Sequence, residues 1–176
     1  DSNSYEFKKN VVYIPDDLLL IDELTGKEYI DFVKNIYLDV KVDFIEQLIK
    51  LFEMEAYINE PIKTYSHGMK KKIQIITAFM VKSKVIVMDE PFRGLDVETT
   101  IILKKLIKQY AALGGSVIIA SHDLVSAEKM CDRMAIVSNG HLMDVGTVDY
   151  LKKKYESEDI DEVFLKCALK DNRGDD

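Results

Sequence analysis

Apolar residues occur along the chain either in short continuous runs or at helical spacing. The continuous runs, typical of strands buried on both faces, lie at 11–14, 85–88, 116–120 and 134–137. Amphipathic spacing predicts two helices within 25–58 and further helices at 97–113 and 124–131. Buried strands that alternate with helices predict an α/β fold around a mostly parallel, covered sheet.

Several helix ends and turns carry local signals. Thr25 followed by Glu28 predicts a capping box, and Ser66 predicts the start of a helix after the break at Pro61. Asn139-Gly140 predicts a hairpin turn into residues 141–145. The tail from residue 147 is predicted to be helical, with an acidic break over residues 156–162.

Composition and charge narrow the possible classes of protein. The chain has 176 residues, of which 47% are hydrophobic and 31% charged, so we expect one globular domain with at most a small subdomain. Its net charge of −7 disfavours bulk binding to nucleic acid. Two cysteines, Cys131 and Cys167, make neither a disulfide framework nor a metal cluster. The chain shows neither a signal peptide nor an apolar run near the roughly 18 residues of a membrane span.

Two carboxylates, Asp89 and Glu90, follow the apolar run 85–88. The carboxyl ends of strands form the edge of an α/β sheet where ligands bind. One carboxylate there can hold Mg²⁺ while the other orients or deprotonates a water. In isolation, however, two acidic residues at the point where a strand reaches solvent are explained better by the bland reading than by a functional pair.

Three more motifs have bland readings when each is taken alone. Ser66 and Gly68 stand at a predicted helix start, where a plain cap and a phosphate-binding loop are both possible. His122 follows the run 116–120 as a loop residue or as a hydrogen-bond donor to a phosphate. Asp96, after Gly94, can be a helix N-cap, a functional residue or both.

The order and spacing of the four motifs resemble the nucleotide-binding domain of ABC transporter ATPases, over nearly all of residues 10–170. Residues 65–70 look like the family's signature loop, 85–90 like its Walker B strand, 94–96 like its D-loop and 121–123 like its switch. The resemblance implies a P-loop NTPase-like, mostly parallel sheet with a helical subdomain. It also implies ATP and Mg²⁺ as the bound molecules.

The resemblance further implies roles for the residues that match the motifs. Asp89 would support Mg²⁺, Glu90 would polarise the attacking water and His122 would contact the γ-phosphate. Phosphoryl transfer depends on such positioned charges and donors more than on covalent chemistry.

Other roles depend on a second ATPase subunit, because the family works as a head-to-tail dimer. Ser66 and Gly68, with His67 and Met69 in the same loop, would bind ATP held by the second copy. Asp96 would act across the dimer seam.

The largest departure from the family is the lack of a Gly-x-x-x-x-Gly-Lys-Ser/Thr loop in these residues. Ile21 and Glu28 flank the Gly26-Lys27 pair, which rules out that motif there. We therefore expect the family's first strands and phosphate loop to precede residue 1, and the chain to be the C-terminal two-thirds of the domain. Alone, it is expected to hydrolyse ATP negligibly and to associate through exposed strand edges.

Three smaller departures concern residues near the site. Asp16 stands where the family has the Q-loop glutamine; a carboxylate still reaches Mg²⁺ through water, so Asp16 stays a candidate for cofactor binding. His67 replaces a glycine and Met69 a glutamine of the signature loop.

We divide the chain into residues 1–20 around the Q-loop strand, 21–80 as helical subdomain with signature, 81–150 as catalytic core and 151–176 as helical tail. The family implies a transmembrane permease as partner and a peripheral place on the cytoplasmic face of the membrane. The segment 161–165 resembles a short helix of drug and peptide exporters, which favours export; an amphipathic terminal helix explains it equally well.

Two alternative functions stay open. A non-catalytic ABC-like interaction module is compatible with the missing phosphate loop. A nucleic-acid-linked ABC ATPase is disfavoured by the acidic charge, and no nucleic-acid partner is expected. The lysine triplets 70–72 and 152–154 are interpreted as solvated faces, or as contacts to anionic lipid or a permease.

Overall fold

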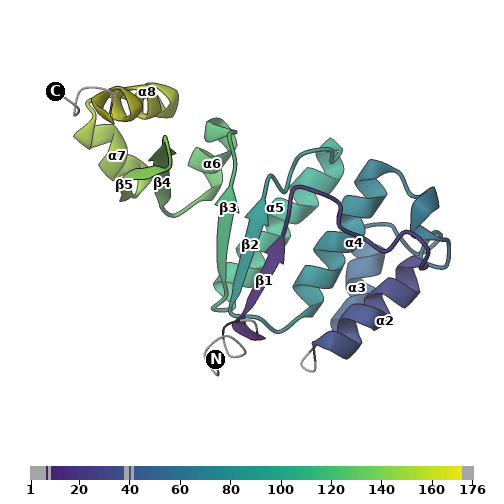
Figure 1. Ribbon diagram of the computed structural model, residues 1–176. Coiled ribbons are helices and arrows are strands. Elements are labelled where there is room, and N and C mark those ends of the chain that lie inside the picture. Colours follow the sequence, from purple (N-terminus) through teal and green to yellow (C-terminus); the bar gives the residue numbers. More distant parts are fainter. Residues whose placement is uncertain (1–6, 8, 38–39, 41, 172–176) are drawn as a thin grey trace. The chain divides into compact units, whose positions relative to one another are not determined.

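The computed structural model describes residues 7, 9–37, 40 and 42–171 (Figure 1). These residues fall into two compact units, Asp1–Ala120 and Ser121–Asp176, each of which is described by itself. The finer four-part division made from the sequence stays a prediction.

A parallel sheet forms the centre of the first unit. Its strands are β1 (Val11–Ile14), β2 (Val85–Asp89) and β3 (Ser116–Ala120), in the order β1-β2-β3. The register pairs Ile14 with Met88 and Asp89 with Ala120, so the carboxyl ends of all three strands meet at one edge. The mostly parallel arrangement predicted from the apolar runs is confirmed for this unit.

The two faces of this sheet differ in burial. One face carries Val12, Ile14, Ile86 and Met88, which are buried. On the opposite face, Tyr13 and Ile118 are 57% and 58% exposed, although a buried strand pattern predicted cover on both sides.

The first unit also contains the helices α2 (Gly26–Ile36), α3 (Val42–Leu51), α4 (His67–Met80) and α5 (Val97–Ala112), and a 3₁₀ turn η1 (Ile62–Thr64). The predicted capping box is present, since the Glu28 amide donates to the Thr25 hydroxyl at 3.2 Å and the Glu28 carboxylate accepts from the Thr25 amide at 2.8 Å. Side chains of Asp96 and Ser66 cap α5 and α4 as the sequence predicted.

The helix α4 lies at the centre of the first unit, with α2 and α3 on one side and β1 on the other (Figure 1). Because it is covered from both sides, every residue from Ile73 to Met80 is buried. Phe79 packs edge-on against Tyr110 of α5, with the ring centroids 5.7 Å apart. This burial makes α4 a rigid support for the loop at its own N-terminus.

The second unit has its own hydrophobic core. It comprises α6 (Leu124–Met130), the antiparallel hairpin β4 (Met134–Ser138) and β5 (His141–Gly146), α7 (Val148–Lys154) and α8 (Ile160–Asp171). The hairpin is confirmed at the Asn139-Gly140 turn, where both residues have a positive φ. The core contains Met134, Ile136, Leu151, Tyr155, Ile160, Val163 and Cys167.

The predicted acidic break is wrong in its length, because α8 already begins at Ile160. Asp161 and Glu162 lie in the first turn of this helix, where negative charge is favourable next to the helix dipole. The acidic stretch 156–162 thus contains the first turn of α8 as well as the interruption before it.

Candidate functional site

The carboxyl end of β2 turns sharply at Glu90. This residue has a φ of +42°, in the left-handed region that non-glycine residues rarely occupy. Its amide donates to the carbonyl of Ala120 at 3.0 Å, and its carbonyl accepts from the Arg93 amide at 3.2 Å. Backbone conformations of this kind cluster at functional sites. The main chain therefore fixes Glu90 at the sheet edge where the sequence placed it.

Asp89, the last residue of β2, lies at the same edge. The hydroxyl of Tyr13 donates to its Oδ2 over a long 3.5 Å, and the side chain is partly exposed. Asp89 thus keeps oxygen lone pairs available for a cation.

Asp16 follows β1 and pairs with a residue that the sequence analysis did not select. Arg93 Nη1 donates to Asp16 Oδ2 at 2.7 Å, which joins the segment after β1 to the turn after β2. The two side chains are 33% and 67% exposed for Asp16 and Arg93, so the pair is worth little stability by itself. A single arginine in a turn offers no sequence signal for such a pairing.

Lys71 corrects the interpretation of the first lysine triplet as a solvated face. Its side chain is 1% exposed, and its ammonium donates to the carbonyl of Pro15 at 3.2 Å. Burial lowers the pKa of Lys71, while the nearby carboxylates of Asp16, Asp89 and Glu90 act in the opposite direction. The lysine faces inward because α4 is covered on both sides. It brings the three candidate acidic residues into one electrostatic environment.

The start of α4 contacts the turn after β2. The hydroxyl of Ser66 accepts from the Met69 amide at 3.2 Å, so Ser66 is the N-cap and Met69 lies in the first turn. A Cβ on Gly94, whose φ is +75°, would lie 2.4 Å from Cδ2 of the His67 ring. A Cβ on Gly68 would lie 3.4 Å from the Gly94 carbonyl. Two residues of the predicted loop, His67 and Gly68, thus lie against Gly94.

Asp96 acts as the N-cap of α5 with both carboxylate oxygens. It accepts from the Thr99 amide at 2.7 Å and from the Thr99 hydroxyl at 2.9 Å. These hydrogen bonds lower the pKa of Asp96, because they favour its ionised form. The capping role is confirmed, and its role across a dimer seam stays a prediction.

His122 belongs to the second unit, two residues after the end of β3. The neighbouring Asp123 caps α6, since its Oδ1 accepts from the Ser126 amide at 3.0 Å, and its own amide donates to the Ser121 hydroxyl at 3.2 Å. The local turn around His122 is therefore well defined within its unit.

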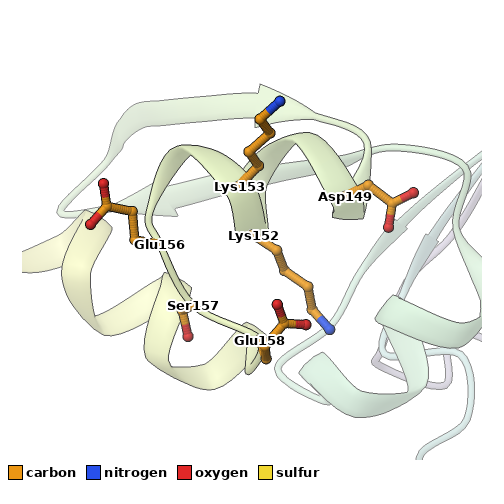
Figure 2. Close-up of a pocket in the computed structure, with 6 residues that line it drawn as sticks. All are labelled: Asp149, Lys152, Lys153, Glu156, Ser157 and Glu158. Atoms are coloured by element: carbon orange, nitrogen blue, oxygen red, sulfur yellow. The ribbon is translucent and has the colours of Figure 1, made fainter.

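Two lysines of the second triplet, Lys152 and Lys153, are among the residues that line a pocket in the second unit (Figure 2). Lys152 and Glu158 point into the same space, whereas Lys153 points away (Figure 2). Lys152 also forms an ion pair with Glu128, and Lys154 pairs with Asp144 at 2.7 Å. Two of the three lysines are therefore neutralised by carboxylates and are not simply a solvated face.

The chemistry of the site suits Mg²⁺ only in company with phosphate oxygens. No group of three or more metal-ligating His, Cys, Asp or Glu side chains occurs among the described residues. Mg²⁺ on phosphate substrates needs just one or two protein carboxylates, which Asp89 and its neighbours supply.

None of the described helices is long and apolar enough to cross a membrane.

The first unit therefore brings together Asp16, Asp89 and Glu90 around Lys71, and His67 and Gly68 against Gly94. Lys71 and Arg93 were missed by the sequence analysis. For Lys71 the one available signal is its place on a helix that is covered on both sides. That signal can be used only once α4 is known to lie between two layers.

Comparison with known proteins gives consistent findings. A family model described as ABC transporter matches residues 1–93. EcsA, an ABC-type transporter ATP-binding protein of Bacillus subtilis (strain 168), is 29% identical over 171 residues, which are 94% of this chain and 69% of that protein. AlbC, an ABC transporter ATP-binding protein of the same organism, is 32% identical over 146 residues, which are 81% of this chain.

The chain spans 60% of the length of AlbC. Among solved structures, an ATP-binding subunit of an ABC transporter matches with a TM-score of 0.88 and 26% identity. That match covers 94% of this chain and 71% of the other.

Proposed function

The chain belongs to the ABC transporter family of ATP-binding proteins and has their α/β, P-loop NTPase-like fold, and we propose that it serves in ATP hydrolysis that drives transport across a membrane. The observation that carries the proposal is the pair Asp89 and Glu90 at the carboxyl end of the central strand, with Glu90 held at a φ of +42°. Ligands bind at this edge of parallel sheets.

Each residue of the site has a chemical task in this proposal. Asp89 would hold Mg²⁺, which would supply positive charge next to the phosphates. Glu90 orients the attacking water and accepts its proton, while the bond between the γ-phosphorus and the bridging oxygen breaks. His122 donates a hydrogen bond to a γ-phosphate oxygen. Asp16 would contribute to holding the metal through water.

The second group of residues is proposed to act on ATP bound by another ATPase subunit. Ser66 and the amide of Gly68 lie at the N-terminus of the 14-residue helix α4, where the helix dipole and free amide groups favour an anion. His67 and Met69 shape the same loop, and Asp96 lies at the dimer seam.

A transmembrane permease is proposed as the other partner, which would place the protein on the cytoplasmic face of a membrane. Export is proposed from the likeness of residues 161–165 to exporter ATPases. In the structure this segment lies in α8, whose Val163 is fully buried in the core of the second unit. That packing suits an amphipathic terminal helix with or without a role in export.

The test is a titration of the purified 176-residue chain with a fluorescent ATP analogue and Mg²⁺, beside a version preceded by the phosphate-loop segment of a relative. We expect weak binding and negligible hydrolysis by the chain alone, because backbone donors and a lysine of a phosphate loop are missing from its sequence. The extended version should bind and hydrolyse ATP, and Glu90→Gln in it should abolish turnover while nucleotide binding remains.

Other outcomes would point elsewhere. Binding without turnover by the extended version would favour the non-catalytic interaction module. Hydrolysis by the short chain that disappears in Glu90→Gln would contradict the predicted inactivity. Tight binding whose affinity is unchanged by Asp89→Asn and Glu90→Gln would place the nucleotide at another site.

A further inference from the structure

Polar side chains on one stretch of α4 bind the main chain of the segment that follows β1. Lys71 Nζ donates to the carbonyl of Pro15 at 3.2 Å, and Gln74 Nε2 donates to the carbonyl of Asp17 at 3.0 Å. These two carbonyl groups flank Asp16 on either side. Asp16 is thus held in place by hydrogen bonds to the main chain of its two neighbours, although it makes neither hydrogen bond itself.

Both donors are buried, which makes these hydrogen bonds costly to break. Lys71 is 1% exposed and Gln74 is 7% exposed. A buried cation without a partner is strongly unfavourable, so Lys71 remains in place only while an acceptor and compensating carboxylates face it. Those carboxylates are Asp16, Asp89 and Glu90, with the Arg93 guanidinium opposing them.

Gln74 is not fully satisfied in this arrangement. Its Oε1 is buried without a hydrogen-bond partner among the described residues, although its Nε2 is engaged by Asp17. A buried amide that leaves one atom unpaired costs stability, so packing alone does not explain a glutamine at this position. Its role is to hold the segment after β1.

The third link lies further along the same segment. Lys70 Nζ forms an ion pair with Asp22 Oδ1 at 2.7 Å, and its side chain is only 20% exposed. Three side chains within five positions of α4 thus bind a segment of eight residues, 15–22. The segment is therefore attached to α4 at three points, Pro15, Asp17 and Asp22.

We propose that Lys71 and Gln74 are positioning residues that grip the main chain on both sides of Asp16 and hold its carboxylate toward Arg93 and the carboxyl end of β2. The inference rests on the proposed function for its purpose, because it links the loop at the start of α4 to the acidic residues of the site. A shift of Ser66 to Met69 is then passed through α4 to Asp16.

The experiment is hydrogen–deuterium exchange on the 176-residue chain and on Lys71→Met, Gln74→Leu and Lys71→Arg. In the first two variants we expect the amides of Leu19 and Leu20, which donate to the carbonyls of Asp17 and Leu18, to exchange about tenfold faster, since a hydrogen bond to a buried donor is worth that much in local opening. Exchange in β2 and α5 should stay unchanged. Lys71→Arg keeps a charged donor and should restore most of the protection.

Lys72→Met is the matched control, because it makes the same chemical change at the next, half-buried position of α4. It should leave the exchange of the Leu19 and Leu20 amides unchanged. If Lys71→Met does not fold, Gln74→Leu still tests the grip at Asp17. Equal acceleration throughout the first unit, or none at Leu19 and Leu20, would overturn the proposal.

ATP-analogue binding is measured on the version preceded by the phosphate-loop segment, without and with the same substitutions, to separate the two proposals. Local loss of protection in the variants, together with no nucleotide binding by the unsubstituted extended version, supports the grip and counts against the proposed function. Unchanged protection in a protein that binds Mg²⁺ and nucleotide does the reverse.

Discussion

Glu90 and Gly94 both have a positive φ, and they bracket the turn that follows β2. At Glu90 a side chain is present in a conformation that favours glycine, while at Gly94 the glycine leaves room for the His67 ring. The backbone of this turn therefore adopts a less favourable conformation that positions these residues. Single substitutions in this turn should have effects that burial alone does not predict.

Gly94→Ala should destabilise the first unit by about 2–4 kcal/mol, from left-handed strain of about 1 kcal/mol plus overpacking against His67. Gly114→Ala is the matched control, since Gly114 has a φ of +92° and a Cβ there would meet nothing within 4 Å. It should cost only about 1 kcal/mol. Urea unfolding measures both, and His67→Ala should recover part of the difference. Equal losses in the two variants would contradict the contact.

Asp96→Ala should cost about 1 kcal/mol at neutral pH, because it removes the N-cap of α5. The pKa of Asp96 is lowered in the folded state by the Thr99 hydrogen bonds. Its stabilisation is therefore complete above the unfolded pKa of about 3.9 and is lost as the pH falls through the lower folded pKa. The difference between wild type and Asp96→Ala should shrink there.

Asp96→Asn is the control for this pH dependence. Asparagine is also a good N-cap but carries no charge, so its free energy of unfolding relative to Asp96→Ala should not vary over the same pH range. Urea unfolding at neutral and acidic pH gives both comparisons. A constant gap between wild type and Asp96→Ala would show that the carboxylate adds nothing as an anion.

The residue scale also shows what a sequence can and cannot predict. The caps at Thr25, Ser66 and Asp96 depend on neighbours three positions away, and all were predicted correctly. The pairing of Asp16 with Arg93 joins residues 77 positions apart and depends on two turns meeting in space. Such long-range polar pairs leave no periodic signal in one sequence.

At the scale of elements, α4 decides both the core and the site. Its burial from Ile73 to Met80 follows from its place between a helical layer and the sheet, which amphipathic spacing alone does not show. The same place turns Lys71 inward, so the lysine triplet consists of one buried residue between two half-buried ones. The position of α4 in the layered fold, and not the local charge pattern, therefore determines which lysine is buried.

The exposed apolar face of the parallel sheet should promote self-association of the chain. Tyr13 and Ile118 are more than half exposed on one face, and exposed apolar surface of this kind favours association. Light scattering over a concentration series should show a dimer or larger species. Ile118→Thr keeps a β-branched residue and should shift the series toward monomer.

Leu113→Thr serves as the control, because Leu113 is 83% exposed but caps the end of α5 and lies outside the strands. It should leave association unchanged. A monomer at all concentrations for the unmodified chain would contradict this prediction.

At the scale of the molecule, two compact units each have a separate core. The cores of the first unit and of the cluster around Leu151 share no residues. The α/β class was predictable, because alternating strands and helices extend along most of the chain. The boundary near Ala120 was not, because no glycine- or proline-rich linker marks it.

Leu151→Ala should therefore destabilise the second unit by about 2–5 kcal/mol, since Leu151 is completely buried in its core. Hydrogen exchange should accelerate across residues 121–171 and remain unchanged in α4 and β2. The converse variant, Ile76→Ala in the fully buried part of α4, should affect the first unit alone. Acceleration throughout the chain in both variants would show that the two units unfold together.

The packing of His67 on Gly94 has a consequence for evolution. A side chain at position 94 and a ring at position 67 compete for the same space, so these two positions cannot vary independently. Among relatives of this chain, those with a bulkier residue at the position of Gly94 should have a small residue at the position of His67. Substitutions at these two positions, which are 27 positions apart in the sequence, should therefore be correlated among the relatives.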